Sequence, residues 1–162
     1  FKGATLVINT LKPAETEKPE TDEPFWIENQ GEYEVKDVIV RGWQTGYEDD
    51  HIKTIYRIDF DEIIIVIMGF LKKEPDPKIL EHLKNADVVI VPGSGKPWLS
   101  STSASKLVRQ IEPRLVIPSF SNGDIKLFLK EFSKDRCEPE EKLTFKKKDL
   151  DNKEMKIVCL KA

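Results

Sequence analysis

The side chains best suited to chemistry in this sequence gather at Tyr47–His51, which reads YEDDH. Two carboxylates, Asp49 and Asp50, stand beside the imidazole of His51, and these groups bind Zn²⁺ or Mn²⁺ in proteins. Adjacent residues direct their side chains apart unless the loop turns tightly. The sequence therefore favours a solvated acidic loop and leaves a weak metal site as the alternative.

Two other short motifs resemble catalytic sequences but lack a necessary part. Gly93–Lys96 reads GSGK, yet a phosphate-binding P-loop would place glycine where Ile90 stands and Ser or Thr where Pro97 stands. Ser100–Ser103 could supply a nucleophile, but no histidine is near in sequence to activate it. We expect a glycine turn at the first motif and a helix N-cap at the second. A ligand-binding role for the GSGK loop stays open, because strand ends in α/β sheets often carry ligands.

The overall composition is that of a globular domain with a charged surface. The chain has 162 residues, 39% hydrophobic and 34% charged, which is enough to bury a core. Its net charge of −3 argues against a nucleic-acid partner held by a general basic field. No stretch approaches the roughly 18–20 apolar residues of a membrane span, and no signal peptide is visible. We therefore expect a cytoplasmic protein with neither membrane nor nucleic acid as partner. Cys137 and Cys159 lack C-x-x-C spacing, and Cys159 is predicted to be a small core residue.

The hydrophobic pattern predicts antiparallel strands first and alternating strands and helices afterwards. We expect strands over 4–8, 33–35, 38–40, 54–59, 63–68, 88–91, 115–117, 143–145 and 155–160. We expect helices over 77–83, 103–111 and 125–132. Residues 12–24, rich in Pro, Glu, Thr and Lys, indicate an exposed loop. The result is one α/β domain spanning residues 1–162.

Several phrases of the sequence recur in order in a known family. They are GEYEV with VIVRG (31–42), TIYRID with IIIVIMG (54–69), and ADVVIVPGSG with ASKLVRQIEPRLVIPSF (86–120). Together they resemble the short, single-domain metal-dependent hydrolases of the metallo-β-lactamase superfamily. The resemblance implies an αββα sandwich. It also implies that this chain is N-terminally incomplete, since the family has further strands before the point where this chain starts.

The same resemblance implies a metal site whose ligands this chain lacks. The family motif H-x-H-x-D-H corresponds to the stretch Leu11–Thr16, so Leu11, Pro13 and Thr16 replace imidazoles and Glu15 keeps a carboxylate. The other family ligands correspond to Tyr47, Phe70 and Phe120, so the resemblance implies that these are degenerate former metal-site positions. Since His51 and His82 are the only histidines, shifting the alignment could restore one ligand but not the set.

These departures predict a catalytically inactive fold that serves as a structural or binding module, without cofactor. Phe70 and Phe120 are expected to fill the former site with apolar packing. The alternative is a metal-dependent hydrolase with an altered or weak Zn or Mn site, whose candidate ligands are Glu15, Asp49, Asp50 and His51. A third possibility is a regulatory domain that binds a small ligand in the old cleft, for which Trp43 and Trp98 border a candidate apolar hollow. We also expect a homo-oligomer or a protein partner that covers an exposed sheet edge.

Overall fold

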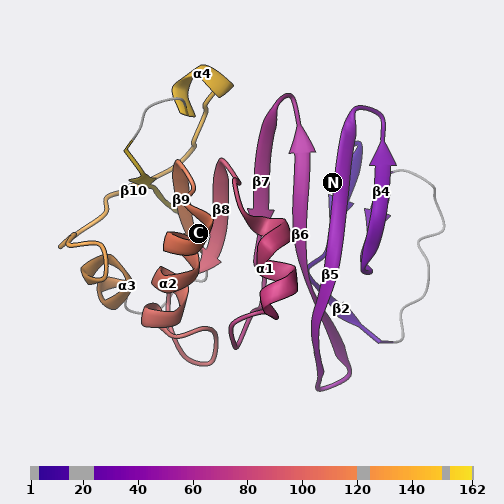
Figure 1. The fold of residues 1–162 in the computed structure, drawn as a ribbon, viewed down its shortest axis with the longest axis horizontal. Helices are drawn as coiled ribbons and strands as arrows, with labels where there is room; N and C mark the ends of the chain where they lie inside the picture. The colour runs from indigo at the N-terminus through magenta and orange to yellow at the C-terminus, as the bar shows by residue number, and fades with distance from the viewer. Residues whose placement is uncertain (1–3, 15–23, 120–124, 151–153, 162) are drawn as a thin grey trace.

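The computed structural model, shown in Figure 1, describes residues 4–14, 24–119, 125–150 and 154–161. Its main feature is an eight-stranded mixed sheet in the order β11-β9-β8-β7-β6-β5-β4, with β2 beside the start of β6. The strands of this sheet are β2 (Leu11–Pro13), β4 (Gly31–Val35), β5 (Val38–Glu48), β6 (His51–Phe60), β7 (Ile63–Ile67), β8 (Val88–Pro92), β9 (Leu115–Ser119) and β11 (Lys156–Ile157). Strands β4 to β7 are antiparallel, whereas β7, β8, β9 and β11 are parallel. The predicted order, antiparallel strands first and alternating strands and helices afterwards, is thus confirmed.

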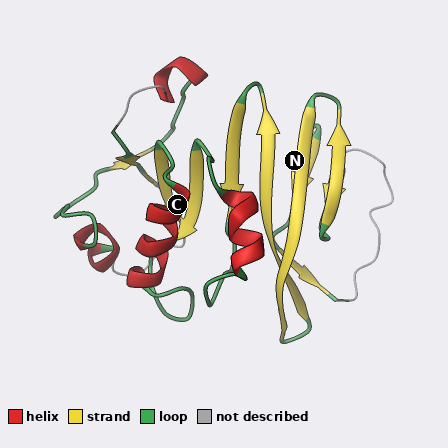
Figure 2. Ribbon diagram, in the orientation of Figure 1, coloured by secondary structure: helices red, strands yellow, loops and turns green. Residues whose placement is uncertain are grey.

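Three helices, α1 (Pro77–Leu83), α2 (Ser101–Ile111) and α3 (Lys126–Lys130), lie over one face of the sheet (Figure 2). A short α4 (Lys147–Leu150) near the end of the chain belongs to the segment that covers the opposite face. Asp76 caps α1 by accepting from the backbone N–H of Lys78. Ser100 caps α2, as predicted, by accepting from the backbone N–H of Ser103. Each cap satisfies a backbone donor that the first helical turn leaves unpaired.

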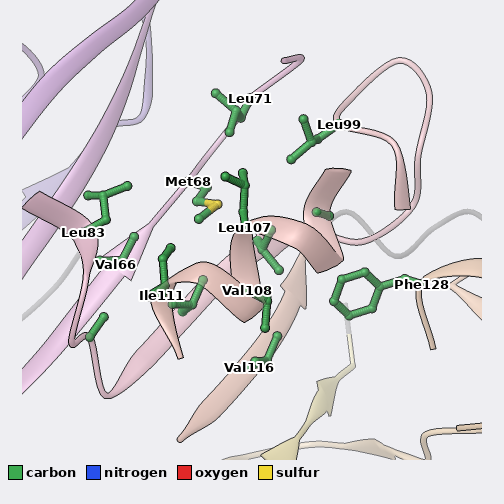
Figure 3. Packing of buried hydrophobic residues seen from close by; sticks show 14 of the residues in the cluster. Val66, Met68, Leu71, Leu83, Leu99, Leu107, Val108, Ile111, Val116 and Phe128 are labelled. Carbon is green, nitrogen blue, oxygen red and sulfur yellow. The ribbon is translucent and has the colours of Figure 1, made fainter. Parts of the chain in front are cut away.

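The principal core lies between this face and the helices (Figure 3). Along each strand, alternate residues point toward it, so Val66, Val89 and Val116 are fully buried under α2. From α2, Leu107 and Ile111 complete the layer. The spacing of apolar residues in that helix therefore predicts the buried face correctly.

The opposite face of the sheet is covered by two separate segments. The two-stranded parallel sheet of β1 (Leu6–Ile8) and β3 (Phe25–Ile27) packs over β5 and β6, where Ile27 contacts the cluster of Val40 and Tyr56. The C-terminal segment covers β7 to β9, with Leu150 and Val158 packed on the sheet. Two short parallel strands, β10 (Pro139–Glu140) and β12 (Cys159–Leu160), join within this segment.

Two expectations for the C-terminal region are wrong. Residues 143–145 do not form a strand; Leu143 and Phe145 pack against the sheet by their side chains alone. The expected strand over 155–160 is two short strands interrupted at Val158. The two cysteines, Cys137 and Cys159, are joined in a disulfide with Cα atoms 6.0 Å apart. Cys159 is nevertheless buried, as predicted.

The outer edge of the main sheet is β4, which pairs with β5 on its inner side. Its outward residues Glu32 and Glu34 are exposed carboxylates, followed by the exposed Lys36 at the turn. Charged side chains on an edge strand discourage pairing with another chain. The expectation that a partner covers a sheet edge stays a prediction. Among the described residues, no helix is long and apolar enough to cross a membrane.

Candidate functional site

The candidate site lies at one edge of the main sheet, where the loops after β7 and β8 meet. The carboxyl ends of the parallel strands β7, β8 and β9 point to this edge, and the β5–β6 hairpin extends beyond it (Figure 1). Two hydrogen bonds link the loops: Leu99 N–H donates to the Leu71 carbonyl at 2.9 Å, and Gly93 N–H to the Ser119 carbonyl at 3.0 Å. Strand ends in α/β sheets are where ligands usually bind.

Glycine at position 69 lets the segment before β2 approach the end of β7. Its φ is +53°, and a Cβ there would lie 2.5 Å from Cβ of Thr10. A side chain at this position would therefore clash as well as strain the backbone. The close approach brings the stretch that contains Leu11 and Pro13 beside the loop that contains Phe70.

The predicted ligand positions in the described residues carry side chains engaged in other contacts. Leu11 and Pro13 belong to β2 and pair with Lys53 and His51 of β6. The half-buried Phe70 meets Trp98 edge to face, with ring centroids 5.0 Å apart. Phe70 thus packs against a neighbouring aromatic ring; that it marks a lost metal site stays a prediction.

Tyr47, by contrast, does not fill the former site. Its side chain is 58% exposed, and its hydroxyl donates to Oδ1 of Asp50 at 2.8 Å. That hydrogen bond raises the pKa of Tyr47 above its usual value. The phenol stays protonated at neutral pH and presents no phenolate. Glu15, Thr16 and Phe120 lie outside the described residues.

The acidic cluster YEDDH forms the tip of a long hairpin rather than an open loop. Asp49 and Asp50 both have positive φ, +50° and +56°, which is the geometry of a two-residue hairpin turn. Nδ1 of His51 lies 2.6 Å from the Asp49 carbonyl, to which the ring N–H donates. In the part of the chain that the structure describes, no three His, Cys, Asp or Glu side chains gather closely enough to hold a metal ion.

A charged cluster that the sequence did not reveal stands beside these positions. Glu48 accepts from Nζ of Lys53 and, at 2.7 Å, from Nζ of Lys72. Lys53 is only 8% exposed, because β6 is flanked there by both β5 and β2. With Tyr47 and Leu71, the three charged residues line a hollow of about 410 Å³.

The two lysines lower the pKa of the Glu48 carboxyl to about 2, first through the hydrogen bond from Lys53 and then through that from Lys72. In turn, Glu48 raises the pKa of Lys72. Glu48 and Lys72 are therefore charged near neutral pH. The cluster carries a net charge of +1, two ammonium groups against one carboxylate.

We expect Glu48→Gln to lower the stability of the fold above pH 4.5 and to have less effect as the pH falls toward 2. The native pKa of Glu48 is depressed from 4.5, so its contribution is fully present above that value and is lost as the pH falls through about 2. Urea unfolding of both proteins at several pH values measures the difference. Glu141→Gln is the matched control, because that side chain is 81% exposed in its pair with Lys161. A gap between wild type and Glu48→Gln that stays constant down to pH 2 would contradict the linkage.

Comparison with known proteins supplies the class of fold. A crystal structure from Thermotoga maritima, described as that of a proposed Zn-dependent hydrolase of the metallo-β-lactamase superfamily, superposes with a TM-score of 0.73 at 20% identity. The match covers 97% of this chain and 81% of that one. The metallo-β-lactamase fold protein YhfI from Bacillus subtilis gives a TM-score of 0.51 at 14% identity, covering 65% of this chain and 47% of its own length. At these identities the likeness shows an α/β metallo-β-lactamase-like fold, with a mixed sheet and few helices, as predicted.

The family follows from the sequence itself. The family model of the beta-lactamase superfamily domain matches residues 5–119, and the chain belongs to the metallo-β-lactamase superfamily. No curated protein matches the chain significantly.

Proposed function

We propose that this chain is a binding module of the metallo-β-lactamase superfamily that performs no metal-dependent hydrolysis. The observation that carries the proposal is the set of side chains at the four former ligand positions that the structure describes: Leu11, Pro13, Tyr47 and Phe70. None of them is an ordinary zinc ligand, since zinc in proteins is held by about four Cys, His, Asp or Glu side chains. The residues present do not fit the family's metal.

The local charge supports the same proposal. Lys53 lies opposite Leu11 in the β2–β6 register, and Lys72 lies two residues after Phe70 in the loop that follows β7. Two ammonium groups beside the former ligand positions repel a divalent cation.

A second candidate function is a metal-dependent hydrolase with an altered Zn or Mn site. The likeness to the proposed Zn-dependent hydrolase of Thermotoga maritima favours it. Its ligands would be Glu15, Asp49, Asp50 and His51. Asp49 and Asp50 are exposed, but Asp50 already accepts from Tyr47 and one ring nitrogen of His51 faces a backbone carbonyl.

The metal content of the protein tests the proposal. We expect protein purified without chelator to hold about 0.1 equivalent or less of Zn, Mn and Fe per chain, because the donor set is insufficient. Elemental mass spectrometry measures this directly. One or two equivalents would refute the proposal and favour the hydrolase.

A matched pair of variants then locates any metal that is found. Asp50→Asn combined with His51→Ala removes candidate ligands, whereas Glu140→Gln removes an exposed carboxylate from the C-terminal strands. Loss of metal in the first variant alone would assign the ion to the hairpin tip.

A further inference from the structure

A second hollow of about 1120 Å³ continues the candidate site toward α2. Residues 72–74 after β7 form one wall, and residues 96–100 before α2 form the other. These two loops lie side by side at the lower edge of the view in Figure 1, joined by the hydrogen bond between Leu99 and Leu71. The walls belong to different strand–helix connections, which the fold brings together at one edge.

The hollow is positively charged although the whole chain carries a net charge of −3. Lys72, Lys73 and Lys96 line it against one carboxylate, Glu74. Glu74 is already bound by Nζ of Lys106 at 2.8 Å, and this contact lowers the pKa of Glu74. Lys72 is bound to Glu48, as described above.

The other two lysines have no such partner. Within the described ranges, no ion pair holds Lys73 or Lys96. An ammonium group donates up to three hydrogen bonds, and its preferred partner is an oxyanion. The hollow therefore has two cationic donors with no carboxylate of the described chain assigned to them.

The remaining lining adds an aromatic surface. Trp98 is half-buried in the wall of the hollow, and its ring makes the edge-to-face contact with Phe70. The Ser100 hydroxyl in the same wall is committed to the α2 cap, where it accepts from Ser103 N–H at 3.1 Å. A ligand of this hollow thus meets ammonium groups and an indole ring.

We propose that the hollow binds a small organic anion, with its phosphate or carboxylate group at Lys73 and Lys96 and its aromatic or apolar part against Trp98. Charge-assisted hydrogen bonds hold the oxyanion, and ring packing on the indole selects for the apolar part. This proposal names a ligand class for the binding module proposed above, and it rests on that proposed function because it treats the hollow as a binding site. It makes no use of a metal.

Titration of the full chain with phenyl phosphate, followed by calorimetry and by amide NMR shifts, tests the inference. We expect saturable binding that weakens about tenfold or more in the K73Q/K96Q double variant, because two charge-assisted donors are lost. The matched control is K156Q/K161Q, which removes two exposed lysines from the C-terminal segment and should leave the affinity unchanged. Benzoate and inorganic phosphate, titrated in parallel, separate a carboxylate ligand from a phosphate ligand.

A third variant tests the aromatic part of the site. Trp98→Leu should weaken phenyl phosphate binding while leaving inorganic phosphate binding as it is. Absence of saturable binding, or equal affinity in K73Q/K96Q and K156Q/K161Q, would overturn the inference. Metal content is measured separately, so the two proposals can fail independently. A metal-free protein that does not bind phenyl phosphate would refute only this inference. A metal-containing protein that binds phenyl phosphate through the two lysines would refute only the proposed function.

Discussion

Replacing Leu99 by alanine should lower the free energy of unfolding by about 3 kcal/mol, within the range of 2–5 kcal/mol usual for large-to-small changes in cores. Leu99 is 1% exposed and lies in the same cluster as Met68 and Leu71, beneath the loops of the candidate site (Figure 3). Alanine removes the buried side chain and leaves a cavity between those loops. Urea unfolding followed by far-UV circular dichroism measures the loss.

The position of Leu99 makes a second effect testable in the same variant. The residue follows Trp98 directly, and its backbone N–H holds the two loops together through the Leu71 carbonyl. We therefore expect the cavity to loosen the wall of the hollow as well as the core. Leu127→Ala is the matched control, because that leucine is 60% exposed and its replacement should cost less than about 0.5 kcal/mol. Equal losses in the two variants would show that Leu99 is not part of the core.

The fold could be predicted from the sequence because its strands and helices carry strong periodic signals. The hairpin of β6 and β7 and the buried face of α2 follow from apolar spacing alone. Residues 143–145 defeat the same reasoning. Leu143 and Phe145 are apolar because they pack on the sheet, yet their backbone finds no strand to pair with. Apolar spacing reports burial of side chains and not the hydrogen bonding of the backbone.

The candidate site was predictable only where a motif marked it. The resemblance pointed to Phe70, which does pack against Trp98, but it also pointed to Tyr47, which faces solvent. Lys53 gave no signal, because a lysine in an alternating strand is normally expected on the exposed face. Lys53 is buried because β6 is flanked by β5 on one side and by β2 on the other. The pairing of β2 with β6 is a tertiary contact across more than 30 residues of sequence. The ion pairs join Glu48 to Lys53 across the β5–β6 hairpin and to Lys72 in the loop after β7, an arrangement that residue spacing alone does not predict.

The disulfide could not be predicted either, because it depends on the fold bringing Cys137 and Cys159 together. Breaking it should lower the free energy of unfolding by about 3 kcal/mol. Cys137 and Cys159 are 22 residues apart in sequence, and a bridge across a loop of that length restricts the unfolded chain by roughly this amount. The bridge ties the segment after α3 to β12, which lies beside β10 at the end of the chain. We therefore expect Cys137→Ser to destabilise the C-terminal segment and, with it, the cover over β7 to β9.

Urea unfolding of wild type and Cys137→Ser, each with and without dithiothreitol, measures this effect and contains its own control. The reductant should destabilise the wild type by about the same amount as the substitution and leave Cys137→Ser unchanged, because the variant has no bridge to lose. Cys137 is the better position to change, since Cys159 is only 5% exposed and its replacement would also alter the packing against the sheet. Wild-type stability that does not respond to dithiothreitol, once thiol titration shows that both sulfurs are reduced, would contradict a stabilising role for the bridge. Retained stability would mean that packing of Leu150 and Val158 on the sheet suffices to hold the C-terminal segment in place.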